Sequence, residues 1–592
     1  ITTQGRLSTV NEFEEIVVRA NPDGSIVRLR DVARVSLEAS SYSTESGMNG
    51  KNAAVLGIYT LPGANAVEVA GQVRETMKEI SKNFPEGLDY EIPFDITSYI
   101  SESIHEVYKT LFEALLLVVL VVFLSLQNWR ASLVPLIAVP ISLIGTFGVM
   151  LVLGFSLNLL TLLGLILSIG IVVDDAIVVV EAVGSYMEKE GLSPYEATKK
   201  AMRGLTGALI ATSLVLAAVF IPVSFLGGIT GLLYRQFAIT IVVSVLISTV
   251  VALTLSPAMC ALLLRPSAPS KNRIFGMINR WLATGNRKYV GIIGKAITNP
   301  RRILAGFGMV LVFIFVLNRV VPGSFMPEED QGYFKVELEL PEGATLERTR
   351  LVTDRAVEFL KAHPAVGYVQ NVTGSSPRVG TNQARSELTV ILKSWEKRKG
   401  NGMEIDQVME DTRKELKQYP EARVYLSKPP VIPGLGTAGG FEMQVEARNG
   451  ATFENLVEAV DTLMKYAAES KAFTGLSSSL QAEIPQLYFD VDRDKAKFLG
   501  IPMSDIFSTM KAYTGSVYVN DFNMFNRVYK VYIQAEAPYR AHKDNINMFF
   551  VKTAGGDMVP LTALGDAEYT TGPGNIRRFN MFTTAVVRGV AA

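Results

Sequence analysis

Six long apolar stretches constrain this 592-residue chain more than any other feature of its sequence. A helix needs about 20 apolar residues to cross the roughly 30 Å of hydrocarbon in a bilayer. Buried helices of a large soluble enzyme are the alternative, but six such stretches, five of them close together, favour a membrane bundle. The stretches are Ile104–Leu126, Leu133–Phe155, Leu159–Val183, Gly204–Leu226, Phe237–Leu264 and Ile303–Val321.

Basic residues in the connecting loops predict the orientation of this bundle. The loop Arg265–Arg302 carries nine Lys and Arg residues and the loop after the third stretch carries four, whereas the two opposite loops hold only Arg235. Positive residues favour the cytoplasm. Because six is an even number, residues 1–100 and 325–592 are expected together on the far side. Residues 272–290 mix apolar and basic side chains, which predicts an amphipathic helix on the cytoplasmic membrane face.

Composition excludes several classes of protein. The formal net charge is zero, so no overall field favours nucleic acid as a partner. The single cysteine, Cys260, lies in an apolar stretch, which rules out an internal disulfide and predicts a buried small side chain. The first residues, Ile-Thr-Thr-Gln, contain no initiator Met or signal sequence, so we expect the chain to be truncated.

The second soluble part has the pattern of a split ferredoxin-like unit, β-α-β-β-α-β. A second copy is predicted to begin with a strand at Phe441–Ala447 and a helix at Phe453–Glu469, followed by an insert. The elements of the first copy are strands at Tyr333–Leu340, Val366–Val372, Glu387–Lys393 and Arg423–Ser427, with helices at Thr345–Ala362 and Glu404–Lys417.

A short repeat indicates an internal duplication. Val18–Leu29 and Val551–Leu561 each read as a strand, a glycine turn and a second strand, near the end of a far-side soluble part. A generic hairpin is the alternative interpretation. If the halves share an ancestor, six further spans are expected outside this sequence, which gives twelve spans in the full protein, as in transporters built from repeats.

Two neighbouring carboxyl groups, Asp174 and Asp175, lie near the middle of the third stretch. A charged side chain at the bilayer centre costs about 2.5–3.5 kcal/mol on insertion scales. Such carboxyl groups bind and release protons, which is what a proton-coupled pump requires. The alternative is a structural polar patch satisfied by neighbouring helices. No Lys or Arg occupies the middle of any of the six stretches, so a cationic partner is expected outside this sequence.

Enzyme signatures are missing from the sequence. It contains no Ser/His/Asp arrangement in a recognisable context, no zinc-ligand spacing and no phosphate-binding loop, which argues against catalysis and against ATP as the direct energy source. No cofactor and no metal site are expected. The sequence therefore predicts a secondary active transporter.

Several motifs resemble the drug-exporting resistance–nodulation–division (RND) family, in particular its AcrB/MexB-like inner-membrane subunits, over essentially the whole chain. Metal-exporting relatives usually carry a single aspartate where this chain has two, so the doublet favours organic substrates, with heavy-metal efflux as the alternative. The motifs are Val172–Glu181, Gln127–Ala131, Gly227-Gly228 with Tyr234–Phe237, Phe325–Gly332, Leu435–Ala438 and Tyr518–Phe522.

The resemblance implies a multidomain protein with a helical membrane bundle and α+β periplasmic porter and docking subdomains. Residues 1–39 would end a docking subdomain, and 40–100 would end a porter subdomain. The remaining boundaries implied are 101–328 for the spans, 329–440 for a porter subdomain, 441–485 with 583–592 for another, and 486–582 for a docking subdomain.

The resemblance also implies partners and a location. It predicts a homotrimer in the inner membrane of a Gram-negative cell, with a periplasmic adaptor (membrane fusion) protein and an outer-membrane channel. Small amphiphilic substrates, namely drugs, detergents or bile-salt-like compounds, would be exported by proton antiport, a cause of antibiotic resistance.

Residue by residue, the resemblance assigns the proton relay to Asp174 and Asp175. Several of the family's aromatic pocket residues are replaced here by small or polar ones, which argues either for a smaller or more polar substrate set or for a pocket built from N-terminal sequence outside this chain. The pocket positions implied are Thr44, Phe94, Val372, Thr389, Tyr425 and Ser477, and the switch loop, Gly374–Gln383, includes Gly374, Ser375, Ser376, Pro377 and Gly380.

Overall fold

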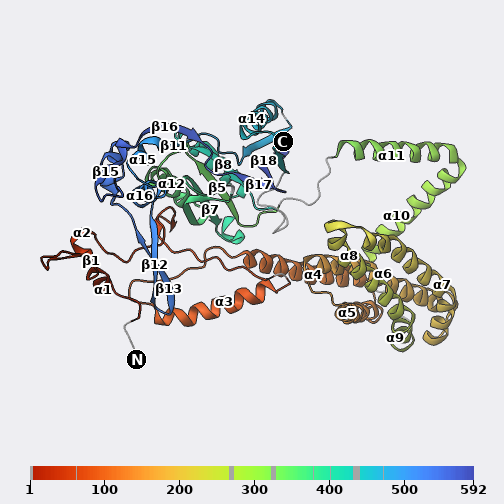
Figure 1. The fold of residues 1–592 in the computed structure, drawn as a ribbon. Coiled ribbons are helices and arrows are strands. Elements are labelled where there is room, and N and C mark those ends of the chain that lie inside the picture. Colours follow the sequence, from red (N-terminus) through yellow and green to blue (C-terminus); the bar gives the residue numbers. More distant parts are fainter. Residues whose placement is uncertain are drawn as a thin grey trace. The chain divides into compact units, whose positions relative to one another are not determined.

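The structure is a computed structural model that describes residues 5–61, 63–265, 273–321, 329–377, 379–400, 402–430, 441–470 and 472–591. The chain divides into two compact units, and Figure 1 labels many of their elements. The soluble unit consists of Ile1–Ile58 and Met326–Ala592, and the membrane unit is Tyr59–Phe325.

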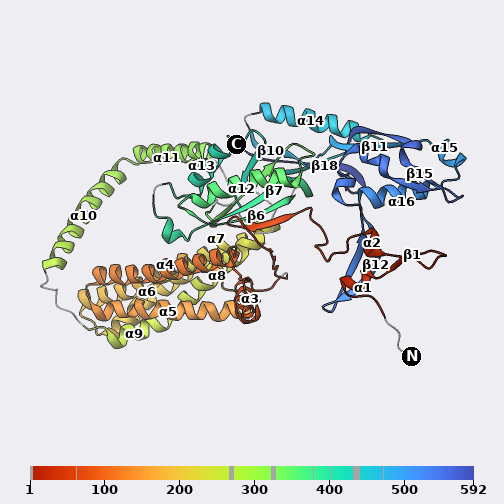
Figure 2. The ribbon, with the colours of Figure 1, turned by 90° about the vertical axis from the view of Figure 1, so that its left-hand side faces the viewer.

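The membrane unit contains six described helical spans that are long and apolar enough to cross a bilayer, which confirms the six predicted stretches. Figure 2 shows α4, α5 and α6 running side by side. The helices are α4 (Ile96–Leu126), α5 (Trp129–Val152), α6 (Leu159–Glu190), α7 (Pro194–Phe220), α8 (Gly228–Leu253) with α9 (Leu255–Leu263), and α11 (Pro300–Val320).

Several helix boundaries differ from the prediction, and two of the differences have identifiable reasons. Helix α4 begins at Ile96 because the Asp95 carboxylate accepts a hydrogen bond from the Thr97 N–H at 2.8 Å, a standard N-cap. The fifth span is interrupted at Thr254. Pro257 has no N–H for the Leu253 carbonyl and its ring would clash with that carbonyl, so the helix breaks and restarts as α9.

Helix α6 is the packing centre of the bundle, since it contacts α4, α5, α7, α8 and α9. Gly164 lets α8 approach closely, because an added Cβ would lie 3.2 Å from the Phe237 carbonyl oxygen. Small residues at such contacts let helix backbones pack in a membrane.

Buried hydroxyl groups join neighbouring helices of the bundle. The Thr146 hydroxyl of α5 donates to Ser244 of α8 at 3.1 Å, and Thr249 of α8 donates to Ser213 of α7 at 2.5 Å. All four side chains are buried. Interhelical hydrogen bonds of this kind stabilise helix packing in a membrane.

Two further helices of the membrane unit lie outside these spans. They are α3 (Ala66–Ile80) and α10 (Arg273–Thr298). Helix α10 confirms that the basic loop is helical and extends past the predicted end at residue 290.

The soluble unit contains the predicted β-α-β-β-α-β order. Its strands belong to a six-stranded sheet with the order β4-β3-β6-β7-β5-β8, in which every described pair is antiparallel. The elements are β5 (Tyr333–Glu339), α12 (Leu346–Ala362), β6 (Val366–Ser376), β7 (Gly380–Leu392), α13 (Ile405–Leu416) and β8 (Arg423–Ser427).

The outer strands β3 (Glu45–Met48) and β4 (Lys51–Asn52) come from the segment before the first span. Strand β3 pairs with β6, with Gly47 opposite Asn371. The segments before and after the membrane spans therefore share one sheet, which no local sequence pattern predicts.

Alternation along the strands separates two faces of this sheet. Phe334, Val336 and Leu338 of β5 point to one face and are fully buried, where they form one apolar core with α12 and α13. Their neighbours Lys335, Glu337 and Glu339 therefore point to the other face, since successive strand side chains alternate.

The second copy is also confirmed at its start, by β9 (Phe441–Glu446) and α14 (Phe453–Glu469). Strand β18 (Phe582–Ala591) pairs with β9, β10 (Phe473–Ser478) and β17 (Arg577–Phe579). The residues between β10 and β17 form β11 (Ile484–Val491), α15 (Arg493–Phe498), α16 (Met503–Thr514), β12 (Val517–Met524), β13 (Arg527–Ile533) and β16 (Gly565–Gly572).

The two proposed repeat segments have the same local structure. Strands β1 (Val17–Ala20) and β2 (Ile26–Arg28) form an antiparallel hairpin, followed by the short helix α2 (Leu29–Val32). Strands β14 (Phe550–Lys552) and β15 (Met558–Pro560) form another hairpin, again followed by a helical turn. The common ancestry of the two halves stays a prediction.

Replacing Phe334 by Ala should lower the free energy of unfolding of the soluble unit by about 3–5 kcal/mol, because a fully buried ring leaves a cavity. Thermal unfolding of the detergent-purified protein measures the change. Tyr466→Ala, at an exposed position of α14, is the control and should shift the transition little. Equal shifts would contradict the assigned core.

Candidate functional site

The carboxyl pair lies at the centre of the longest helix of the bundle. Helix α6 runs from Leu159 to Glu190, so Asp174 and Asp175 are its two middle residues. The surrounding Val172, Val173 and Ala176 are buried against neighbouring helices. Both carboxyl groups therefore lie far from either end of the span.

Asp175 has a specific partner on α8. The Ser248 hydroxyl lies 3.1 Å from a carboxylate oxygen of Asp175 and 3.2 Å from the Val172 carbonyl oxygen. Ser248 is buried, and Ser244 lies one helical turn away on the same face of α8. One hydroxyl hydrogen serves one acceptor at a time, so these two oxygens compete for it.

Asp174 has different surroundings. Adjacent residues of a helix point about 100° apart, and Asp174 is exposed on the bundle of described helices, whereas Asp175 is half-buried. The pair therefore presents one carboxyl to α8 and the other to the outside of this bundle.

A second candidate site lies on the face of the six-stranded sheet opposite α12 and α13. The pairing registers align side chains in rows that cross the strands. Tyr333 and Ile391 are also opposite each other on this face, and burial raises the pKa of the Tyr333 phenol, which keeps it protonated. One row is Ser46, Val372, Glu387, Glu337 and Tyr425, and the next is Met48, Gln370, Thr389, Lys335 and Ser427.

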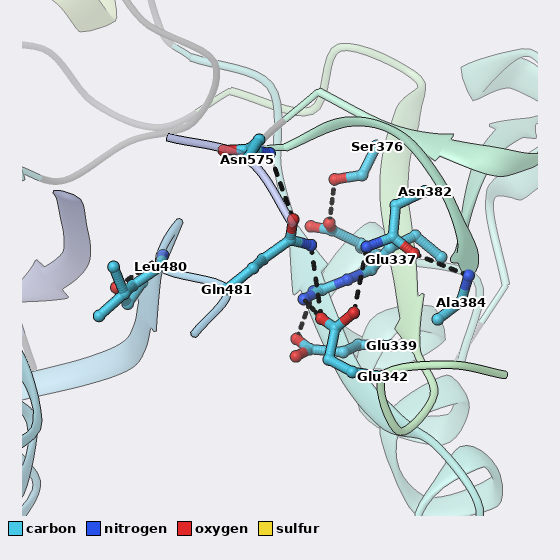
Figure 3. Close-up of polar contacts among 11 residues, drawn as sticks. Glu337, Glu339, Glu342, Ser376, Asn382, Ala384, Leu480, Gln481 and Asn575 are labelled. Atoms are coloured by element: carbon cyan, nitrogen blue, oxygen red, sulfur yellow. Dashed lines mark hydrogen bonds and ion pairs between the residues drawn. The ribbon is translucent and has the colours of Figure 1, made fainter. Parts of the chain in front are cut away.

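The end of the β6–β7 hairpin bends at Gly374 toward this face. The register shifts between Thr373 and Ser375, and Gly374 has φ +87°. Such a bulge redirects the strand that follows it. The Ser376 hydroxyl then donates a hydrogen bond to Glu337 of β5, as Figure 3 shows.

Ion pairs occupy the same face. Lys335 pairs with Glu387, while Arg385 pairs with Glu339 at 2.6 Å and with Glu342 at 3.2 Å. Arg385 is buried, and its Nε has no hydrogen-bond partner among the described residues.

The network continues into the next part of the soluble unit. Gln481 donates to Glu342 at 3.4 Å and accepts from Asn575 at 3.2 Å, so it lies between these two residues in Figure 3. An added Cβ at Gly343 would lie 3.1 Å from Pro485. The turn after β5 therefore lies beside the segment that links β10 to β11 and beside the start of β11.

The structure brings some of the predicted pocket residues together and separates others. Val372, Thr389 and Tyr425 share the sheet face described above. Thr44 directly precedes β3, whereas Ser477 is buried on β10, in the sheet formed with β9, β17 and β18. Phe94 belongs to the membrane unit.

The predicted switch loop is mostly strand. Gly374, Ser375 and Ser376 end β6, Pro377 lies in the turn, and Gly380 begins β7. Residue 378 and the motif Leu435–Ala438 lie outside the described residues.

Sequence reasoning missed Ser248 and Glu337. Ser248 is one of many hydroxyl residues in the spans, so nothing local distinguishes it. Glu337 could have been identified from the sequence, because the alternation of Tyr333–Leu340 places it on the sheet face away from Val336 and Leu338, which are buried.

Comparison with known proteins decides the family. The model of the AcrB/AcrD/AcrF family matches residues 1–592. The chain belongs to that family. It is an RND transporter subunit, and the six spans among its described residues make it a multi-pass protein of the inner membrane.

Named relatives of this family extend the comparison. The chain is 40% identical to multidrug export protein AcrF of Escherichia coli K12, over 100% of the chain and 58% of the relative. It is 38% identical to multidrug resistance protein MdtF of the same strain, over 100% and 58%. It is 37% identical to the multidrug/solvent efflux pump membrane transporter MepB of Pseudomonas putida, over 99% and 56%. The chain thus spans little more than half the length of these relatives.

Gly374→Ala should destabilise the soluble unit by about 1–3 kcal/mol more than Gly380→Ala. Both positions have positive φ, which costs about 1–2 kcal/mol for any other residue. Only at Gly374 would the new Cβ also lie 2.1 Å from the Ser43 carbonyl oxygen, whereas nothing lies within 4 Å at Gly380. Thermal unfolding compares them, and equal losses would contradict the close contact with Ser43.

Proposed function

We propose that this chain is part of a pump that exports amphiphilic drugs, detergents or bile-salt-like compounds in exchange for protons. The observation that carries the proposal is the pair Asp174 and Asp175 at the centre of α6, in a chain of the AcrB/AcrD/AcrF family. The names of the relatives, which speak of drugs and solvents, support organic substrates over metal ions.

The carboxyl pair is proposed as the proton relay. A charged carboxylate deep in a membrane is costly, so uptake of a proton changes which conformation of the surrounding helices is favoured. When Asp175 is ionised, it accepts the hydrogen bond from Ser248 at 3.1 Å. When it is protonated, it becomes a donor itself, and Ser248 can turn to the Val172 carbonyl.

This exchange would couple protonation to helix packing. Ser248 lies on α8 and Asp175 on α6, so a change of donor and acceptor alters the contact between the two helices. We propose that a cationic partner of the pair lies in the part of the relatives' length that this chain does not span.

The face of the six-stranded sheet opposite α12 and α13 is proposed as part of the substrate path. Val372, Thr389 and Tyr425 lie together there, and the β6–β7 hairpin end with Gly374, Ser375, Ser376, Pro377 and Gly380 bends toward it. Thr44, Phe94 and Ser477 complete the proposed set of pocket residues.

The subdomain boundaries are proposed as predicted. Residues 1–39 and 486–582 would form docking subdomains, and 40–100, 329–440 and 441–485 with 583–592 would form porter subdomains. Spans and their cytoplasmic helix would occupy 101–328. The complete protein would be a homotrimer that works with a periplasmic adaptor and an outer-membrane channel.

Asp175→Asn in the full-length protein should abolish the protection that it gives a pump-deficient host against organic toxicants. The amide cannot take up and release a proton, so the relay stops. Growth in a dilution series of each toxicant is the readout, with the amount of protein in the membrane measured by immunoblot.

Glu181→Gln is the matched control, since it makes the same chemical change on the same helix at an exposed position. It should leave protection intact. Unchanged protection in Asp175→Asn would refute the relay, and a response limited to metal salts would favour heavy-metal efflux instead.

A further inference from the structure

Helix α10 differs from the other amphipathic helices of the protein in the sign of its charges. Its charged side chains are all basic, and the sequence from residue 197 to residue 327, which includes α10, contains no Asp or Glu. By contrast, α12 and α14 of the soluble unit each carry several acidic residues. A segment with charges of one sign attracts a partner of the opposite sign.

Acidic residues of the described chain do not neutralise α10. Arg280, Arg287 and Lys295 are exposed, and among the described residues none of the three forms an ion pair. Glu190, at the end of α6, pairs instead with Lys200 of α7 at 2.5 Å. The positive charge of α10 is therefore available to a partner outside the described residues.

The basic and apolar side chains of α10 lie on opposite faces. At about 100° per residue, Arg280, Arg287 and Lys295 fall within an arc of about 80°. Tyr289 and Ile293 lie on the opposite side of the helix, and both are exposed. A helix with one basic and one apolar face is typical of the bilayer interface, where the apolar face enters the boundary of the acyl chains.

Both ends of α10 adjoin membrane spans. Asn299 alone separates its last residue from α11, into which it leads in Figure 1. Near its start, the amides of Asn279 and Gln127 exchange hydrogen bonds at 2.7 and 3.2 Å. Phe275 packs edge-to-face on Phe123 of α4, with the ring centroids 6.1 Å apart. These contacts hold α10 at the membrane surface where α4 ends and α11 begins.

Tryptophan side chains occur at the same surface. The sequence contains three Trp, and two of them are Trp129, which begins α5 just after the end of α4, and Trp281 of α10. Their side chains are 64% and 76% exposed, and the Arg130 guanidinium lies 5.4 Å from the Trp129 ring. Trp is enriched at the level of the lipid headgroups, so α10 is surrounded by phosphate groups.

We propose that α10 binds the headgroups of anionic phospholipids through Arg280, Arg287 and Lys295, in the bilayer that the spans cross. Guanidinium and ammonium groups form charge-assisted hydrogen bonds with phosphate, and their long side chains reach past the apolar face to do so. A zwitterionic headgroup carries a cancelling positive charge, so α10 selects lipids with net negative charge. The site is separate from the proton relay and does not depend on the proposed export function.

The test measures lipid binding to the purified full-length protein in dodecyl maltoside micelles. Fluorescence anisotropy of labelled phosphatidylglycerol should show an affinity at least about tenfold higher than that of labelled phosphatidylcholine. This preference should shrink as salt is added, because the basic side chains are exposed. The combined variant Arg280→Gln, Arg287→Gln and Lys295→Gln should bind the two lipids equally.

Matched variants separate charge from structure. Lys414→Gln, Lys417→Gln and Lys511→Gln together make the same kind of change at three exposed positions of the soluble unit and should have no effect. Arg280→Lys with Arg287→Lys keeps the charge and should retain the preference. The comparison of the two lipids in the wild type tests the proposal even if the combined variant of α10 does not fold.

Each outcome decides for or against the lipid site. Equal affinity of the wild type for the two lipids, or an unchanged preference in the combined variant of α10, would overturn it. Ile293→Gln weakens the apolar face and should lower phosphatidylglycerol affinity. If this variant leaves that affinity unchanged and a single-stranded oligonucleotide displaces the lipid, α10 is a nucleic-acid site instead. Loss of protection in Asp175→Asn tests the relay alone and leaves the lipid site standing.

Discussion

The hydrogen bond from Ser248 to Asp175 joins α8 to α6 at the middle of the α6 helix. Backbone groups of a helix are satisfied internally, so only side chains can change their partners within a membrane. Threonine and serine hydroxyls join α8 to α5 and α7 through neutral hydrogen bonds. Among the described side chains that hydrogen-bond between these helices, Asp175 is the one with an ionisable group.

In the soluble unit, the six-stranded sheet carries apolar side chains on one face and charged side chains on the other. One face buries Phe334, Val336 and Leu338 under two helices, which fixes the fold. Since that face supplies the stability, the opposite face can hold charged side chains such as Glu337 and Glu387 at a tolerable cost. The bend at Gly374 then places a polar hairpin end over the charged row.

Much of this architecture could be predicted because its signals are local and repetitive. Apolar length gave the six spans, and alternating periodicity gave the β-α-β-β-α-β order. Features that depend on a single residue were harder. Because Asp95 caps α4, the helix begins with polar turns that a search for apolar stretches leaves out. Pro257 interrupts the fifth span, although the composition of that span is apolar on both sides of the break.

The candidate sites were predictable only where one residue type is improbable in its surroundings. Two aspartates in a membrane helix are conspicuous, whereas their serine partner on α8 is not. Val372, Thr389 and Tyr425 came from a family resemblance, and the registers place them on one face. Glu337 was overlooked because a charged residue in a strand usually faces solvent, and its cover comes from a hairpin 39 positions later in the chain.

The pairing of β3 with β6 has a consequence for biosynthesis. A ribosome completes Glu45–Met48 long before it reaches Val366–Ser376, and every span between them is made in the interval. The early strand must therefore wait for its partner strand, and an unpaired strand edge is a risk for aggregation. Membrane insertion and closure of the soluble sheet are thus successive steps, and a delay in the first leaves the second open to chaperones and proteases.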